Sequence, residues 1–302
     1  MKKKNILRLM VISAFLLLCP FRIADAGHPA QDIMSFYDGE LPNRNTVEPY
    51  IVSILALNEV EGGRHFAEVQ RFILWYFSKL NYPDHHGLTG TIYVYTLEGG
   101  QERSTQRYDS VDGYSGLFLH LLHRYVVKTG DLELIRANWN KIEDIAYTLP
   151  ALQDKDGLTR ALPDSRVKYL MDNCEVYGGL SDYLQLRKLA GKGPSEYYSR
   201  VRDSVRNGIF AALYDPRHRL FAWAVENNEK SRSSWKVFYP DAYAQLFPIY
   251  YDLLKDRPDV QRRLWRTFSR RYAGKEGTFP VEQRIIYNLT RVKMGDMVAD
   301  DK

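Results

Sequence analysis

Cysteine is scarce in this chain of 302 residues, which contains only Cys19 and Cys174. Long hydrophobic runs are also missing, since the uncharged, mostly apolar run Leu9–Cys19 has only eleven residues. A helix needs about 20 apolar residues to span a bilayer. These two absences exclude a disulfide-stapled scaffold and a polytopic membrane protein. Burial of a hydrophobic core must therefore hold the fold together.

A strong excess of one charge is absent from most of the chain. The net charge of +5 comes from 42 Lys and Arg against 37 Asp and Glu. The first 26 residues contain five of the bases and one of the acids, which is +4 and leaves +1 for the rest. Nucleic-acid binding requires a concentrated basic surface. The composition therefore argues against a nucleic-acid partner.

The amino-terminal segment has the layout of a secretory signal peptide. A basic start precedes the apolar run, which is followed by Pro20 and by the small residues Ala24 and Ala26. This pattern predicts a signal peptide over 1–26 and an exported mature domain over 27–302, periplasmic or secreted. The alternative is a lipoprotein with a lipidated Cys19. It is less favoured, because Leu18 stands where the lipoprotein peptidase prefers a small residue.

Apolar residues recur at helical spacing along most of the remaining chain, and short strands are expected in the linkers. Gly130, Pro83 and Pro150 are expected to end three of the helices. The predicted helices cover 47–60, 66–80, 114–129, 132–149, 173–190, 194–213, 240–255, 257–272 and 281–293, and the predicted strands cover 91–96 and 220–225. The sequence therefore predicts an all-α fold of serial helical hairpins with small β-ribbons.

An internal repeat marks the starts of four of these helices. An acid, any residue and a tyrosine recur at Glu48, Asp112, Glu175 and Asp241, with spacings of 64, 63 and 66 residues. A turn element recurs between them as Asp-x-x-Gly-Leu-Thr at 84–89 and 154–159. Such a period indicates stacked supersecondary units that bury their apolar faces against one another.

Three segments that contain these repeats carry a family resemblance: 108–114, 172–180 and 239–246. Together with the serial hairpins, they resemble the six-hairpin glycosidase superfamily over roughly 46–256. The resemblance implies an (α/α) toroid, or a partial toroid, with a carbohydrate cleft at its mouth. The superfamily contains hydrolases, lyases, phosphorylases and inactive relatives, so the fold alone does not fix the chemistry.

The chain is short for six such hairpins. Six repeats of this period would take about 384 residues, whereas 276 remain after removal of residues 1–26. We therefore expect an incomplete toroid whose open seam exposes Ile54, Ile285 and Leu289. An exposed apolar seam of this kind favours self-association.

Two acidic pairs with the spacing Asp-x-x-acid are the candidate catalytic residues: Asp109 with Asp112, and Asp172 with Glu175. Glycoside hydrolysis uses two carboxyl groups on either side of the scissile bond. Adjacent helices lie about 8–10 Å apart, close to the separation used by inverting enzymes. Glu175, in an apolar sequence context, is the candidate acid and Asp112 the candidate base. The alternative is that these acids only cap helices.

Aromatic side chains near the acids are candidates for stacking on sugar rings. Tyr114, Tyr177, Trp235 and Tyr239 are the predicted substrate contacts, with Asp241 as a further contact or a substitute acid. The alternative for the helical tyrosines is core packing. No cofactor or metal is expected, because the pair His85-His86 lacks further ligands and no phosphate loop or dinucleotide motif is present.

The predicted function is that of an exported glycoside hydrolase acting on a polysaccharide or oligosaccharide. One alternative is a non-catalytic glycan-binding or scaffold protein on the same fold. Another is a polysaccharide lyase in which Tyr177 or His120 abstracts a proton. The sequence leaves all three open.

Overall fold

The computed structural model describes residues 28–99 and 101–295. The predicted signal peptide and Cys19 lie outside the described residues. Cys174, which lies inside them, is a buried free thiol.

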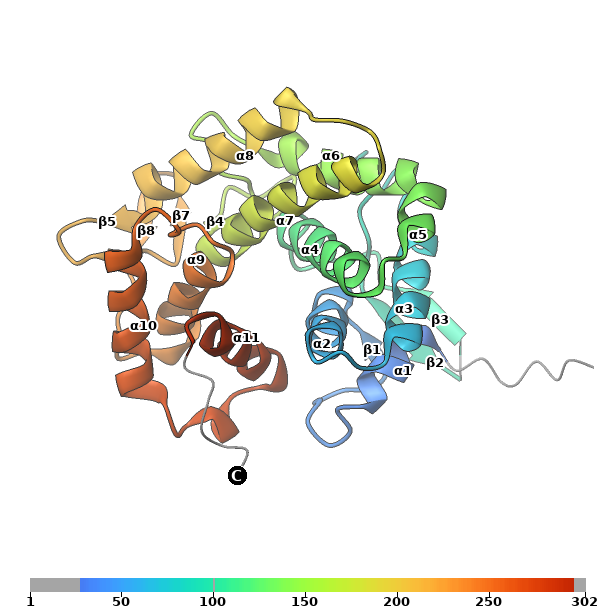
Figure 1. The fold of residues 1–302 in the computed structure, drawn as a ribbon, viewed down its shortest axis with the longest axis horizontal. Helices are drawn as coiled ribbons and strands as arrows, with labels where there is room; N and C mark the ends of the chain where they lie inside the picture. Colours follow the sequence, from blue (N-terminus) through green and yellow to red (C-terminus); the bar gives the residue numbers. More distant parts are fainter. Residues whose placement is uncertain (1–27, 100, 296–302) are drawn as a thin grey trace, which may run out of the picture.

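The centre of the described part of the chain is a ring of five helices (Figure 1). Each of these inner helices packs against the next inner helix along the chain, and the last packs back onto the first. In ring order these are α2 (Pro49–Glu61), α4 (Asp112–Thr129), α7 (Leu170–Leu189), α9 (Phe247–Tyr250) and α11 (Val281–Lys293).

An outer layer covers this ring. It consists of α1 (Pro29–Ser35), α3 (Phe66–Ser78), α5 (Leu132–Ala137), α6 (Trp139–Leu152), α8 (Glu196–Gly208) and α10 (Pro258–Tyr272). These helices are amphipathic: α10 buries Leu264, Trp265 and Phe268 and presents arginines to solvent. Because an outer helix needs only one apolar face, its periodicity is clear in the sequence.

Short antiparallel strands lie in the linkers. One sheet has the order β1 (Thr46–Val47), β2 (Tyr95–Glu98), β3 (Gln101–Ser104), and another β4 (Lys168–Tyr169), β7 (Ala224–Glu226), β8 (Glu229–Ser231). A third pairs β5 (Tyr214–Asp215) with β6 (Leu220–Phe221). The register sets Val47 opposite Tyr95, and Lys168 opposite Val225. The all-α toroid with small β-ribbons is thus confirmed.

Several predicted boundaries are wrong. The helix expected over 240–255 is instead a π-helical turn, η2 (Phe238–Ala242), a 3-10 turn, η3 (Tyr243–Leu246), and the single turn α9. Pro240 and Pro248 lack the N–H that a regular helix needs. A further π-turn, η1 (Ile209–Leu213), follows α8, and a 3-10 turn, η4 (Glu276–Thr278), precedes α11. Helix α6 continues past Pro150 to Leu152, and the strand expected from residue 91 begins at Tyr95.

The expected open seam is also corrected. Ile54 is fully buried and Ile285 is 3% exposed, because α11 packs against α2 and closes the ring. Leu289 is partly buried against the same core. An ion pair between Arg284 and Glu40 crosses this junction. The exposed apolar seam that favoured self-association is therefore not present in the described part of the chain.

Helices α4 and α7 make the closest approach in the ring. A Cβ atom placed on Gly179 would lie 2.4 Å from the carbonyl oxygen of Gly116, and one placed on Gly116 would lie 2.6 Å from the backbone of Glu175. Only glycine at these positions allows the two backbones to touch. The contact brings the two acidic pairs, at the starts of these helices, side by side.

Candidate active site

Helices α2, α4, α7 and α11 begin at one mouth of the ring, where they and the turns η2 and η3 enclose a cavity of about 190 Å³. Four carboxyl groups and four tyrosines dominate its lining. It is lined by Glu48, Tyr50, Ile51, Ile54, Asp109, Ser110, Tyr114, Met171, Asp172, Tyr239, Tyr243, Glu282 and Gln283. We refer to it as the carboxyl cavity.

The first acid of each Asp-x-x-acid pair lines this cavity. Asp109 is exposed, and Asp172 is 9% exposed. The N-cap positions of α4 and α7 are occupied by Val111 and Tyr169, so Asp109 and Asp172 are not the capping residues. The capping alternative therefore does not account for Asp109, whereas Asp172, in the first turn of α7, lies where the helix dipole favours a negative charge.

Ser110 links the two acidic pairs. Its Oγ lies 2.9 Å from Asp112 Oδ1 and 2.9 Å from Asp172 Oδ2, and it accepts the N–H of Gly113 at 3.0 Å. A hydroxyl has one proton to donate, so it can satisfy two carboxyl groups only when one of them is protonated.

Of the two carboxyl groups that Ser110 contacts, that of Asp172 is the better placed to hold the proton. Burial, together with the charge of Asp112, raises the pKa of Asp172 well above its usual range. Burial also raises the pKa of Asp112. The Thr159 hydroxyl at 2.6 Å and the Gly113 N–H at 2.9 Å donate to its carboxylate and partly offset this rise. The proton therefore sits on Asp172, at the wall of the cavity.

The second acid of each pair lies deeper. Asp112 and Glu175 are both 0% exposed. Helix α7 begins at Leu170, three residues before the predicted start, which places Glu175 in its second turn. Tyr50 donates to Glu175 Oε1 at 2.7 Å, and Oε2 has no hydrogen-bond partner among the described residues. Burial raises the pKa of Glu175 well above its usual range, which favours the neutral form of this carboxyl.

Two cavity carboxylates were not among the predicted site residues. Glu48 accepts from the Tyr114 hydroxyl at 3.3 Å, and burial and the charge of Asp109 raise its pKa. Burial likewise raises the pKa of Glu282. The repeat could have identified Glu48, whose acid-x-Tyr motif matches the other three. Glu282 has no such signal, because no tyrosine follows it at the start of α11.

The predicted substrate contacts are distributed over several places. Tyr114, which is 4% exposed, and Tyr239, which is 54% exposed, line the carboxyl cavity. Trp235 lines a separate groove, and Tyr177 lines a cavity at the opposite mouth of the ring. Asp241 is buried, and its Oδ2 accepts the Ser234 N–H at 2.7 Å. Asp241 therefore anchors the loop before η2.

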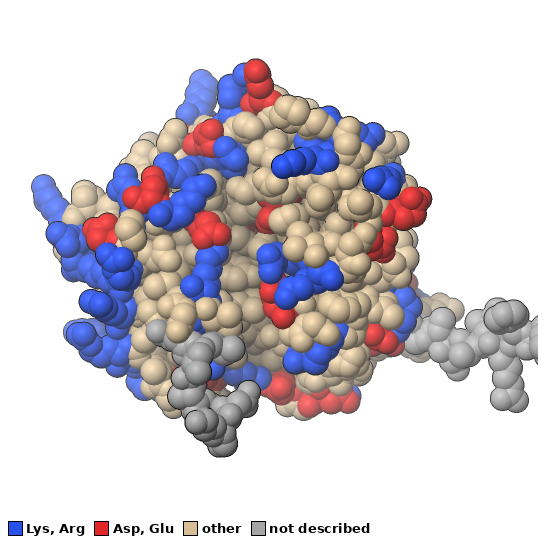
Figure 2. Space-filling model, viewed as in Figure 1, with Lys and Arg blue, Asp and Glu red and all other residues tan. Residues whose placement is uncertain are grey.

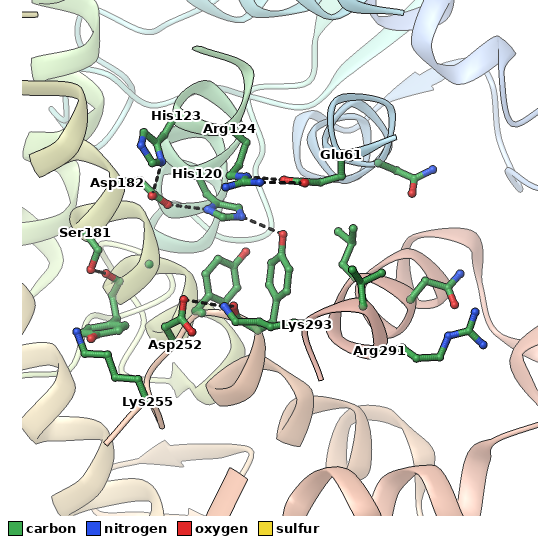
Figure 3. A pocket seen from close by; sticks show the side chains of 18 of the residues that line it. Glu61, His120, His123, Arg124, Ser181, Asp182, Asp252, Lys255, Arg291 and Lys293 are labelled. Atoms are coloured by element: carbon green, nitrogen blue, oxygen red, sulfur yellow. Dashed lines mark hydrogen bonds and ion pairs between the residues drawn. The ribbon is translucent and has the colours of Figure 1, made fainter. Parts of the chain in front are cut away.

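The opposite mouth contains a larger cavity of about 870 Å³ (Figure 3). His120 and His123 each contact Asp182 at 2.6 Å, and His120 also contacts the Tyr250 hydroxyl at 2.9 Å. Burial alone would raise the pKa of Asp182, but the two histidines lower it.

The other carboxylates labelled in Figure 3 are also paired, Glu61 with Arg124 and Asp252 with Lys293. Each of these carboxylates is thus already held in an ion pair with a cation of the same chain. The carboxyl cavity is therefore the better candidate for acid–base chemistry.

Within the described ranges, no group of three or more His, Cys, Asp or Glu side chains could hold a metal ion. In the same part of the chain, each helix is too short or too polar to cross a membrane.

Comparison of the sequence with protein-family models gives no match, and neither does comparison with curated proteins. Solved structures with the same fold are found. A rhamnosidase from Klebsiella oxytoca with rhamnose bound matches with a TM-score of 0.57 at 14% identity, over 85% of this chain and 47% of that one. An α-mannanase of glycoside hydrolase family 76 from Bacteroides thetaiotaomicron matches with a TM-score of 0.56 at 11% identity, over 91% and 79%.

A cellobiose 2-epimerase from Bacillus thermoamylovorans matches with a TM-score of 0.52 at 10% identity, over 74% of this chain and 60% of that one. The chain thus spans about half of the rhamnosidase and three fifths of the epimerase. These likenesses confirm the (α/α) toroid fold.

Proposed function

We propose that this chain is an exported glycoside hydrolase whose reaction takes place in the carboxyl cavity. Asp172 protonates the leaving oxygen, and Asp109 acts as the carboxylate on the other side of the bond. One observation carries the proposal: a buried carboxyl whose pKa burial raises and an exposed carboxyl, from the starts of adjacent inner helices, line the same cavity. This is the pairing of acid and base that glycoside hydrolysis requires.

The two roles follow from the surroundings of each carboxyl. The charge of Asp109 contributes to the raised pKa of both Asp172 and Glu48, so the three groups lie close enough to interact. Asp172 keeps its proton because it is buried, whereas Asp109 is open to water. The proposal therefore assigns the acid to Asp172 rather than to Glu175, and the base to Asp109 rather than to Asp112.

The size of the cavity bears on the substrate. At about 190 Å³ it is smaller than the roughly 300 Å³ at which typical ligand pockets begin. A single sugar ring is therefore the largest group expected at its base, with the exposed Tyr239 as a stacking surface at the rim. The three proteins that share the fold, a rhamnosidase, a mannanase and an epimerase, are consistent with a carbohydrate ligand.

The small volume also favours the alternative of a non-catalytic glycan-binding protein. The lyase alternative has less support, because Tyr177 and His120 line the cavity at the opposite mouth, away from the free carboxyl groups. Unsaturated products that absorb ultraviolet light would identify a lyase.

Turnover by paired variants tests the proposal. The purified mature chain is screened against a panel of polysaccharides and aryl glycosides, and D172N and D109N are compared on the glycan that is cleaved. We expect each substitution to lower kcat by about a hundred-fold or more, since general acid–base groups contribute 10²–10⁴. The control D259N changes an exposed aspartate at the start of α10 and should keep full activity.

Two results would contradict the proposal. Loss of activity in E175Q and D112N, with D172N and D109N active, would return the catalytic roles to the buried pair. Binding of a glycan without turnover of any substrate would instead support the glycan-binding alternative. Export is tested separately by mass spectrometry, which should give a mature amino terminus at Gly27 and no acylated Cys19.

A further inference from the structure

A second concave surface lies on the outside of the ring, between the β5–β6 hairpin, the end of β8 and helix α10. This groove has a volume of about 840 Å³. Five cationic side chains line it: Arg217, Arg219, Lys230, Arg232 and Arg263. We refer to it as the basic groove.

Acidic side chains do not balance these cations. Asp215 is the one acid in the groove lining, and it is already satisfied by His218 at 2.7 Å and by the N–H of Arg217 at 2.9 Å. The five cations form no ion pair with any residue that the structure describes. Figure 2 shows basic side chains gathered over this side of the molecule, at the left.

Concentration of charge here contrasts with residues 27–302 taken together, which have a net charge of only +1. Further exposed arginines on α10 extend the positive surface: Arg262, Arg266, Arg270 and Arg271. Like charges held together in this way create a positive potential that attracts an anionic partner.

A short segment with an aromatic residue at each end, Trp235 and Tyr239, connects the groove to the carboxyl cavity. Trp235 lines the groove, and Tyr239, four residues further along the chain, lines the cavity. The segment between them is fixed at two points: the Ser234 N–H donates to Asp241, and the Tyr272 hydroxyl donates to the Trp235 carbonyl at 2.8 Å. A short segment with two hydrogen-bonded anchors therefore links the two sites and places one aromatic side chain in the lining of each.

We propose that the basic groove binds an anionic polysaccharide, carboxylated or sulfated, and leads its strand toward the carboxyl cavity. The binding step stands on the groove alone, and the delivery step rests on the proposed function. A strand that follows a groove with cations and an indole ring is held by charge and by stacking on its sugar rings.

Burial reduces the negative charge with which the cavity would oppose such a strand. Burial favours the protonated forms of Asp172, Glu48 and Glu282. A polysaccharide is favoured over a membrane surface, since the cations line a concave groove that a flat surface would not enter. It is favoured over a nucleic acid, since the groove leads to a cavity lined by carboxyl groups, which offer no cation to a phosphate.

Binding measurements with matched charge variants test this inference. Polygalacturonate, hyaluronate and dextran sulfate are the anionic probes, and dextran is the neutral control. R217A/R263A removes two groove charges, and R136A/K188A removes two exposed charges from α5 and α7. We expect at least one anionic probe to bind, with a Kd that rises ten-fold or more in R217A/R263A and less than two-fold in R136A/K188A. Binding should weaken between 0.05 and about 0.5 M salt, where screening becomes strong.

Three outcomes would overturn the inference. These are absence of binding to all three anionic probes, an equal loss in both double variants, and preferential binding to a single-stranded oligonucleotide or to phosphatidylglycerol vesicles. D109N/D172N separates the two proposals, since it removes the proposed catalytic groups but none of the groove cations, and so should lose turnover while it still binds the anionic probe. Groove binding without turnover leaves the groove proposal standing and rejects the hydrolase. Turnover of a neutral glycan without groove binding does the reverse.

Discussion

At the scale of single residues, position relative to the helix start decides what each acid does. Asp109 precedes α4 and is open to water, whereas Asp112 is the first residue of that helix and is sealed by Thr159 and Gly113. In α7 both acids lie inside the helix, Asp172 in the first turn at 9% exposure and Glu175 in the second turn at 0%. The same residue type therefore acts as an exposed carboxylate, a buried anion or a buried neutral acid, according to its depth in the ring.

Glu175 should make stability depend on pH. Burial raises the pKa of Glu175 in the folded chain above the ordinary value of about 4.3, so the unfolded chain loses this proton first. The stability that the bound proton contributes is present below about pH 4. It is lost as the pH rises toward the folded pKa, by about 1.4 kcal/mol per pH unit.

E175Q carries a permanently neutral group and should escape this loss. We expect the free energy of unfolding of the variant, relative to the unmodified chain, to increase between pH 5 and pH 8, as measured by urea denaturation. E133Q changes an exposed glutamate in α5 and serves as the control. Parallel pH profiles for E175Q and the unmodified chain would show that Glu175 is ionised in the fold.

The sequence predicts only part of the set of acids that line the carboxyl cavity. The Asp-x-x-acid spacing identifies Asp109 and Asp172, which line the cavity, but it does not say which acid of each pair faces inward. That depends on α7 beginning at Leu170, and no strong N-cap residue in the sequence marks this start, since Tyr169 occupies the position. Glu282 was missed because its neighbours in the cavity come from distant segments.

At the scale of elements, glycine sets the spacing of the two central helices. Gly116 and Gly179 allow the backbones of α4 and α7 to touch, and Gly178 leaves room for the ring of Tyr251, which would lie 2.2 Å from a Cβ at this position. The separation of the acidic pairs is thus fixed by residues that carry no side chain.

G116A should disrupt this contact. Its Cβ would meet the backbone of Glu175, which cannot rotate away as a side chain can. We expect a loss of about 3 kcal/mol or more in the free energy of unfolding, at or above the usual range for overpacking. G277A is the matched control, because a Cβ there meets nothing within 4 Å. Equal stability of G116A and the unmodified chain would mean that α4 and α7 can separate without cost.

Most elements were predictable because their apolar residues recur with one period. Helices α3, α10 and α11 agree with the predicted ranges to within about two residues. The backbone of the segment 240–255 was not predictable in this way. Its apolar residues are buried on all sides, so their spacing does not distinguish an α-helix from a π or 3-10 turn. Its prolines, rather than its periodicity, decide the backbone.

At the scale of the whole molecule, the described residues form a closed ring with fewer inner helices than a six-hairpin toroid. Counting repeats gave four inner helices and an open seam. Helix α11 fills the seam although its start lacks the acid-x-Tyr motif. The repeat could not predict this closure, because it follows from the shape of the ring rather than from any local pattern.

I285A should weaken the junction between α11 and α2. Ile285 is 3% exposed, so its truncation leaves a cavity and should lower the free energy of unfolding by about 2–5 kcal/mol. V292A changes an apolar residue of the same helix that is 48% exposed, and it should have little effect. Thermal or urea denaturation of both variants provides the measurement. A small effect of I285A would indicate that the ring opens readily at this junction.

Closure of the ring by α11 also sets an order of events during synthesis. Helix α2 leaves the ribosome more than 200 residues before α11, yet each covers the other. Until α11 emerges, the side of α2 that will face it has no partner, and contacts between such distant segments form slowly. The nascent chain therefore presents an apolar surface to chaperones, or to other nascent chains, while the segment between the two helices is synthesised. Completion of the last inner helix, rather than the number of hairpins already made, ends that exposure.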